Sequence, residues 1–111
     1  MLIKHFAAFL FSKYIARKTL RWIKNPLSAQ NTVFQSLVNS AKNTSFGREH
    51  NFKKISSYDH WKKNVPIRDY EGIKTYIDKI ISGEKNVLWP GKPKYFSKTS
   101  GTTSGAKYIP I

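Results

Sequence analysis

The residues best suited to chemistry lie near the end of the sequence, in a run rich in hydroxyl groups and glycine. Glycine lets the backbone turn tightly and bring its N–H groups close to an anion, and hydroxyl groups add further donors. Lys107 adds a positive charge beside this run. These features together favour a polyphosphate ligand. We therefore predict a phosphate-binding loop made of Thr99, Ser100, Gly101, Thr102, Thr103, Ser104, Gly105 and Lys107.

The spacing of this loop differs from that of the Walker-type phosphate loop, whose pattern Gly-x-x-x-x-Gly-Lys-Ser/Thr leads into a helix. Here three residues separate Gly101 from Gly105, and Ala106 precedes Lys107. The flanking segments are short and aromatic or aliphatic, so residues 94–111 are predicted to form a β-hairpin that carries the loop. A simple hairpin turn needs only about two to five residues, and the seven residues 99–105 therefore favour a ligand site.

The elements that must position this loop are predicted to be helical. Apolar residues recur at helical spacing from Leu2 to Ile23, and the basic residues are expected on another face, so residues 1–25 read as an amphipathic helix. Asn25-Pro26 should end it, because the residue before a proline is pushed out of the helical region. We favour packing of this helix on its own domain over a place on a membrane surface.

The middle of the chain, residues 26–93, is predicted to be a largely helical segment that begins with a helix over 27–42. Gly47 is expected to supply a turn, with Phe46 and Phe52 packing the following loop onto a core. His50 is interpreted as structural, because no second histidine or carboxylate stands at a metal-binding or relay spacing from it.

Two further helices are marked by capping residues in this segment. Ser57 should cap a short helix that Val65-Pro66 ends, and another helix should begin near Asp69 and end at Gly83. We predict no catalytic acid or base and no metal site among the 111 residues. The chain alone therefore reads as mostly α-helical with a C-terminal β-hairpin.

The charge balance allows two other functions. Twenty Lys and Arg against six Asp and Glu give a formal net charge of +14, which leaves open a small basic module that binds nucleic acid or a membrane surface. Sixteen of the twenty are Lys, scattered along the chain, whereas phosphate and base readers favour clustered Arg. We therefore expect no nucleic-acid partner. With no cysteine and no segment of transmembrane length, we expect a cytoplasmic location and no integral membrane segment.

The loop also resembles a known signature. Residues 96–107 are similar to the phosphate-loop signature of the adenylate-forming superfamily, which includes acyl-CoA synthetases, luciferases and the adenylation domains of peptide synthetases. More narrowly, the segments 44–50, 65–71 and 82–88 resemble, in order and spacing, the Gretchen Hagen family of auxin-responsive acyl-acid amido synthetases and its bacterial relatives. This resemblance covers the chain from about Leu27 to Ile111.

The resemblance implies an α/β fold for the full-length family, of which residues 1–111 are an incomplete N-terminal part of one large adenylate-forming domain. It also implies an enzyme that consumes ATP and Mg²⁺ to couple a small carboxylic acid to an amine or amino acid through an acyl-adenylate. The pockets for the acid and for adenosine, and any Mg²⁺ carboxylate, are expected beyond Ile111. The fragment alone is therefore expected to be inactive.

Overall fold

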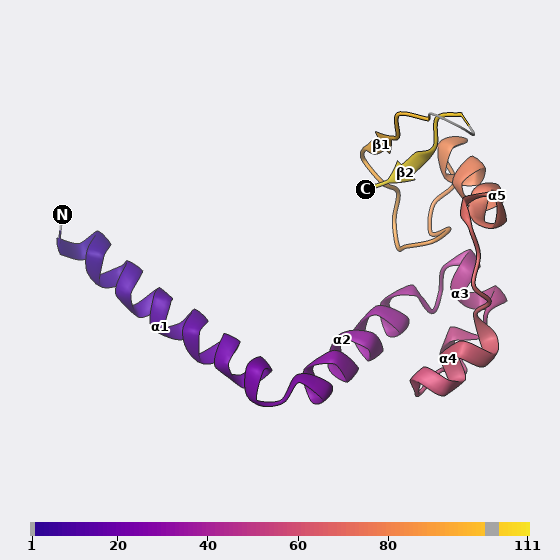
Figure 1. The fold of residues 1–111 in the computed structure, drawn as a ribbon. Helices are drawn as coiled ribbons and strands as arrows, with labels where there is room; N and C mark the ends of the chain where they lie inside the picture. The colour runs from indigo at the N-terminus through magenta and orange to yellow at the C-terminus, as the bar shows by residue number, and fades with distance from the viewer. Residues whose placement is uncertain (1, 102–104) are drawn as a thin grey trace. The chain divides into compact units, whose positions relative to one another are not determined.

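A computed structural model describes residues 2–101 and 105–111 of the chain. It contains five α-helices, one 3₁₀ helix and two strands within this part of the chain: α1 (Leu2–Lys24), α2 (Pro26–Ala41), α3 (Ser45–Glu49), η1 (Phe52–Lys54), α4 (Tyr58–Asn64), α5 (Tyr70–Ile81), β1 (Phe96–Lys98) and β2 (Tyr108–Pro110) (Figure 1). The mostly helical chain with a C-terminal hairpin is as predicted. Two compact units divide the chain at residue 34, and each is described by itself.

The first unit contains α1, whose side chains from residue 3 to residue 24 are all exposed. The predicted helix and its end before Asn25-Pro26 are confirmed. The predicted separation into an apolar and a basic face is wrong. Arg17 lies seven residues after Leu10 and Arg21 seven after Tyr14, which is about two turns, so basic and apolar side chains share one face.

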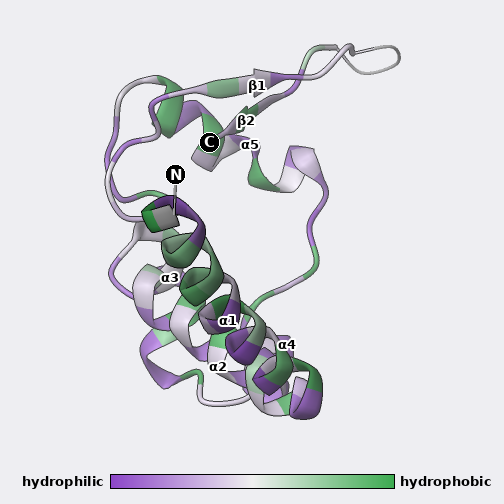
Figure 2. Ribbon diagram, turned by 90° about the vertical axis from the view of Figure 1, so that its left-hand side faces the viewer, coloured by the Kyte–Doolittle hydropathy of each residue, from purple (hydrophilic) through white to green (hydrophobic). Residues whose placement is uncertain are grey.

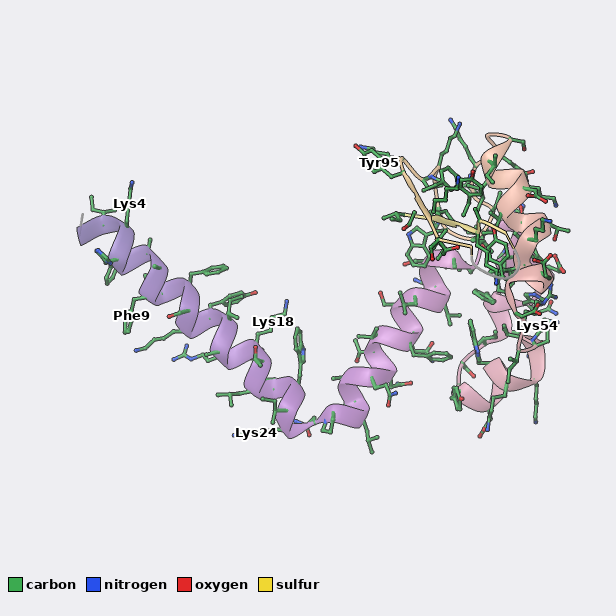
Figure 3. All side chains as sticks on the ribbon, turned by 45° about the horizontal axis from the view of Figure 1, so that its top comes forward. Lys4, Phe9, Lys18, Lys24, Lys54 and Tyr95 are labelled. Atoms are coloured by element: carbon green, nitrogen blue, oxygen red, sulfur yellow. The ribbon has the colours of Figure 1, made fainter. Side chains whose placement is uncertain are left out.

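Hydrophilic and hydrophobic residues accordingly alternate along the ribbon of α1 (Figure 2). The side chains project in several directions, and Lys4 and Phe9 point to opposite sides of the helix (Figure 3). Among the described residues, no helix is both long and apolar enough to cross a membrane.

The half-buried side chain of Phe46 packs against the core of the second unit. Its ring makes edge-to-face contacts with His50, Phe52 and Tyr76, at centroid distances of 4.3, 5.8 and 5.2 Å. Phe52 is buried, so the two phenylalanines pack the segment onto the core as predicted. His50 is also buried, and its Nε2 lies 3.4 Å from Nη2 of Arg68, which agrees with the structural role expected of it.

Gly47 does not form the turn that the sequence suggested. It lies inside the short helix α3, where a Cβ atom would stand 2.1 Å from the carbonyl oxygen of Ala41. Glycine is needed there because the backbone of α2 occupies the space of a side chain. Thr44 caps α3 instead, since its buried hydroxyl accepts the N–H of Gly47 at 2.9 Å.

The last helix of this segment ends at Ile81, close to the predicted end at Gly83, and residues 84–95 form an irregular loop. This loop is tied to the core by α3, whose first N–H groups have no partner inside the helix. Those of Ser45 and Phe46 donate to the carbonyl oxygens of Asn86 and Val87 at 2.8 and 3.0 Å. The segment that leads into β1 is thereby fixed to the helices.

The predicted caps of α4 and α5 are confirmed. The Ser57 hydroxyl accepts the N–H of His60 at 3.2 Å, and the Asp69 carboxylate accepts the N–H of Gly72 at 2.9 Å. Gly83 has a φ of +99° just after the last turn of α5, where only glycine turns without strain. The helix fixed in this way begins at Tyr70 and lies beside β2 (Figure 1).

Candidate functional site

We call residues 99–107, which join β1 to β2, the candidate loop. The strands are antiparallel, with Lys98 opposite Tyr108. At the base of the loop the N–H of Thr99 donates to the carbonyl oxygen of Lys107 at 3.0 Å, and the N–H of Lys107 donates to the Thr99 hydroxyl oxygen at 3.1 Å. Thr99 therefore closes the loop with both its backbone and its side chain.

The loop folds back on itself at Gly101. A Cβ atom at this position would lie 2.6 Å from the carbonyl carbon of Gly105 and 2.7 Å from the nitrogen of Ala106. Gly101 and Gly105 have φ angles of +59° and +79°, in the region that favours glycine. The two glycines therefore bring both sides of the loop together, and only Gly101 also requires the absence of a side chain for reasons of space.

The remaining predicted residues divide into two groups. Ser100 is exposed and lies between the loop base and the Gly101 contact. Thr102, Thr103 and Ser104 lie outside the described residues, so their place in the site stays a prediction.

Positive charge accumulates at the ends of the loop. The Nζ atom of Lys107 lies 5.4 Å from the ring centroid of Tyr70, and that of Lys98 lies 5.9 Å from the ring centroid of Tyr108. Within residues 2–101 and 105–111, the ion pairs are Lys62–Asp59, Arg68–Glu49 and Lys74–Glu71. No carboxylate in the described chain neutralises the two lysines at the loop, so an anion bound there gains their attraction.

Tyr70 is a residue of the site that the sequence interpretation missed. Its hydroxyl accepts the N–H of Tyr108 at 2.9 Å and donates to the carbonyl oxygen of the same residue at 3.3 Å. In the sequence Tyr70 is only an apolar position at the start of a helix. Nothing local to it indicates a partner 38 residues away.

An apolar groove of about 450 Å³ runs between α5 and β2 below the loop; its lining includes Tyr70, Ile73, Leu88 and Ile109. No group of three or more His, Asp or Glu side chains in the described part of the chain is placed to hold a metal ion. The described site therefore offers backbone and hydroxyl donors, two lysines and an apolar wall. These groups suit a phosphate-bearing ligand better than acid–base chemistry.

Comparisons with known proteins agree with the resemblance. The model of the GH3 family N-terminal domain matches residues 16–111. Indole-3-acetic acid-amido synthetase GH3.15 of Arabidopsis thaliana is 44% identical over 54 residues, which cover 47% of this chain and 9% of that protein. The 4-substituted benzoates-glutamate ligase GH3.12 of the same plant is 44% identical over 48 residues, covering 42% and 8%.

A longer alignment is found with indole-3-acetic acid-amido synthetase GH3.4 of Arabidopsis thaliana, which is 27% identical over 97 residues, or 83% of this chain and 16% of that protein. The aligned parts thus span less than a fifth of each of these relatives. No solved structure matches the chain significantly. The matched range contains the candidate loop and all three segments on which the resemblance rested, and the chain therefore belongs to the GH3 family, to its N-terminal domain.

Proposed function

We propose that the protein containing this chain is an ATP-dependent ligase that couples a carboxylic acid to an amine or amino acid through an acyl-adenylate. The relatives named above are amido synthetases and a glutamate ligase, which supports ligation as the class of reaction. The observation that carries the proposal is the candidate loop, closed at Thr99 and Lys107 and folded tightly at Gly101, with no carboxylate of the described chain beside its lysines.

In the first step the carboxylate of the acid attacks the α-phosphorus of ATP, and pyrophosphate leaves with its electron pair. Negative charge grows on the leaving group, so donors fixed beside it stabilise the transition state more than the bound substrate. We assign this role to the N–H groups around Gly101 and Gly105, to the hydroxyls of residues 100 and 102–104, and to the ammonium group of Lys107. In the second step the amine attacks the acyl carbon and AMP leaves.

We assign Thr99 a structural part in this site. Its hydroxyl oxygen already accepts the N–H of Lys107, so it stabilises the closed loop and orients the residue that carries the charge. A loop whose base is already closed needs less reorganisation there when the phosphates bind.

Mg²⁺ commonly binds one or two carboxylates together with substrate phosphates. The last acidic residue of the chain is Glu84, and none occurs in the hairpin. The residues described here do not fit a Mg²⁺ site, and we derive no step through the ion.

The test is carboxylic-acid-dependent exchange of labelled pyrophosphate into ATP by the full-length protein, with a panel of aromatic and aliphatic acids. We expect exchange with at least one acid. Replacing Thr102 and Thr103 together by Val should slow it about ten- to a hundredfold, at roughly 1.4 kcal/mol per factor of ten. Thr75→Val, at an exposed position of α5, is the matched control and should leave the rate unchanged.

Absence of acid-dependent exchange with every acid would contradict the proposed reaction. Unchanged exchange in the Thr102→Val, Thr103→Val variant would contradict the role of the loop while leaving the reaction in place. Residues 1–111 alone should form no amide, and an amide product from them would show that the acid and amine sites lie within this chain.

A further inference from the structure

Tyr70 meets the hairpin at the point where the candidate loop returns to β2. Both hydrogen bonds of its hydroxyl go to the backbone of Tyr108, the residue that follows Lys107. The ring of Tyr70 also lies beside the Lys107 ammonium group, 5.4 Å from Nζ to the ring centroid. One side chain of α5 therefore contacts both the end of the loop and the residue that carries its charge.

The register of the hairpin explains why Tyr108 needs such a partner. In an antiparallel pair, bonded and non-bonded residue pairs alternate. Thr99 is hydrogen-bonded to Lys107 and Tyr95 to Ile111, so Tyr108 falls in a non-bonded pair and its N–H and C=O face away from β1.

On the outer side of β2 these two groups would lack a partner among the described residues without Tyr70, since a strand edge exposes unpaired N–H and C=O groups. The Tyr70 hydroxyl satisfies both, because a phenol donates one hydrogen bond and accepts another. It thus takes the place of a neighbouring strand at this single residue.

The helix that carries Tyr70 is anchored in the core. Tyr70 is the first residue of α5, which is capped at Asp69 and buries Ile77 and Ile80 in the core. Movement of Tyr108 away from Tyr70 would carry Lys107 with it, because the two residues are adjacent. The position of Lys107 therefore depends on the Tyr70 hydroxyl as well as on the two hydrogen bonds of Lys107 to Thr99.

We infer that Tyr70 is a positioning residue, which holds the exit of the candidate loop and the Lys107 ammonium group in place for the phosphates of the nucleotide. This inference rests on the proposed function, and it adds a residue outside the glycine-rich run to the nucleotide site. Tyr70 acts through Tyr108 and Lys107 and is assigned no contact with the reacting atoms.

The test is Tyr70→Phe in the full-length protein, which removes the hydroxyl and keeps the ring beside Lys107. Without nucleotide, the amide of Tyr108 should exchange with deuterium at least about tenfold faster, measured by fragment-resolved mass spectrometry, because it loses its acceptor. In acid-dependent pyrophosphate exchange, kcat/KM for ATP should fall about tenfold, while KM for the acid stays unchanged.

Two matched variants separate positioning from general stability. Tyr58→Phe alters the first residue of α4, where Nζ of Lys62 lies 5.1 Å from the ring centroid, and no bond from the Tyr58 hydroxyl to the hairpin occurs in the described structure. Tyr58→Phe should change neither the deuterium exchange at Tyr108 nor kcat/KM for ATP. Tyr76→Phe removes the part-buried hydrogen bond from Tyr76 to Glu49 and should lower the melting temperature without speeding deuterium exchange at Tyr108.

Unchanged exchange at Tyr108 in Tyr70→Phe would overturn the inference. So would a fall in kcat/KM for ATP no larger than that caused by Tyr76→Phe, because the effect would then be one of stability. If the wild-type protein shows no acid-dependent exchange, the proposed function fails, and the deuterium exchange of Tyr108 alone decides whether Tyr70 holds the loop exit.

Discussion

Replacing each of the two glycines of the candidate loop by alanine separates two energetic costs. Both variants bear the cost of a side chain at a positive φ, and only one of them also bears the cost of a steric clash. Gly101→Ala and Gly105→Ala each place a methyl group at a positive φ, +59° and +79°. At Gly101 the new Cβ would lie 2.6 Å from the carbonyl carbon of Gly105, whereas at Gly105 no atom of the described residues stands within 4 Å. The difference between the two variants therefore measures the close approach of the two sides of the loop.

The expected difference between the two variants follows from the cost of the backbone conformation and the cost of the steric clash. The left-handed conformation costs an L-residue about 1–2 kcal/mol, and this applies to both variants. Overpacking against atoms that cannot move aside costs a further 1–3 kcal/mol or so, and this applies only to Gly101→Ala. At about 1.4 kcal/mol per factor of ten, kcat/KM for ATP should be about five- to 140-fold lower in Gly101→Ala than in Gly105→Ala.

The assay is kcat/KM for ATP in acid-dependent pyrophosphate exchange, with thermal unfolding of the same samples. Gly91→Ala is the control, because Gly91 has a φ of +86°, has no atom within 4 Å of its Cβ position and lies outside the loop. It should lose some stability and keep kcat/KM for ATP. Equal losses of kcat/KM in Gly101→Ala and Gly105→Ala would refute the reasoning, because the close approach at Gly101 would then have no energetic consequence.

Three further predictions concern the core that supports the hairpin. Gly47→Ala should lower the free energy of unfolding by about 2–3 kcal/mol, because its Cβ would lie 2.1 Å from the Ala41 carbonyl oxygen. Thr44→Val should lower it by about 1–3 kcal/mol, since the buried hydroxyl accepts from Gly47 at 2.9 Å and donates to Ala41 at 2.7 Å. Burial, and then the hydrogen bond to Glu49, raise the pKa of Tyr76 above its usual value, so its neutral form stabilises the folded state below about pH 10 and this contribution is lost as pH rises through the raised pKa. Denaturant unfolding at a series of pH values should show a steeper loss above about pH 10 in the wild type than in Tyr76→Phe.

A control measurement tests each of these three stability predictions. Gly72→Ala, also within a helix, meets only side-chain atoms at 3.0 Å or more and should change the free energy of unfolding by no more than about 1 kcal/mol. Ser57→Ala removes an exposed cap and should cost about 1 kcal/mol, less than Thr44→Val. Equal losses of stability in Gly47→Ala and Gly72→Ala would contradict the steric explanation, and equal losses in Thr44→Val and Ser57→Ala would contradict the importance of burial. An equal loss of stability above about pH 10 in the wild type and in Tyr76→Phe would contradict the role of the Tyr76 hydroxyl.

Much of the local structure could be predicted from the sequence, because the interactions that decide it lie within a few residues. Ser57 and Asp69 accept N–H groups three residues ahead of them, and Gly83 ends α5 through its own φ. The hairpin was predictable in the same way from two short apolar segments on either side of a run rich in glycine and hydroxyl groups. Family membership also followed from local segments, since their order and spacing are properties of the chain alone.

Tertiary structure alone decided what surrounds these elements. Gly47 was read as a turn because glycine often makes one, but its reason is the carbonyl oxygen of Ala41, which only the packing of α3 on α2 brings there. Thr99 was predicted from the sequence to bind phosphate, but in the structure its hydroxyl oxygen accepts the N–H of Lys107 and closes the loop. The contact of Tyr70 with Tyr108 spans 38 residues, and no periodicity or motif encodes such a pair, because it exists only once α5 and β2 lie side by side.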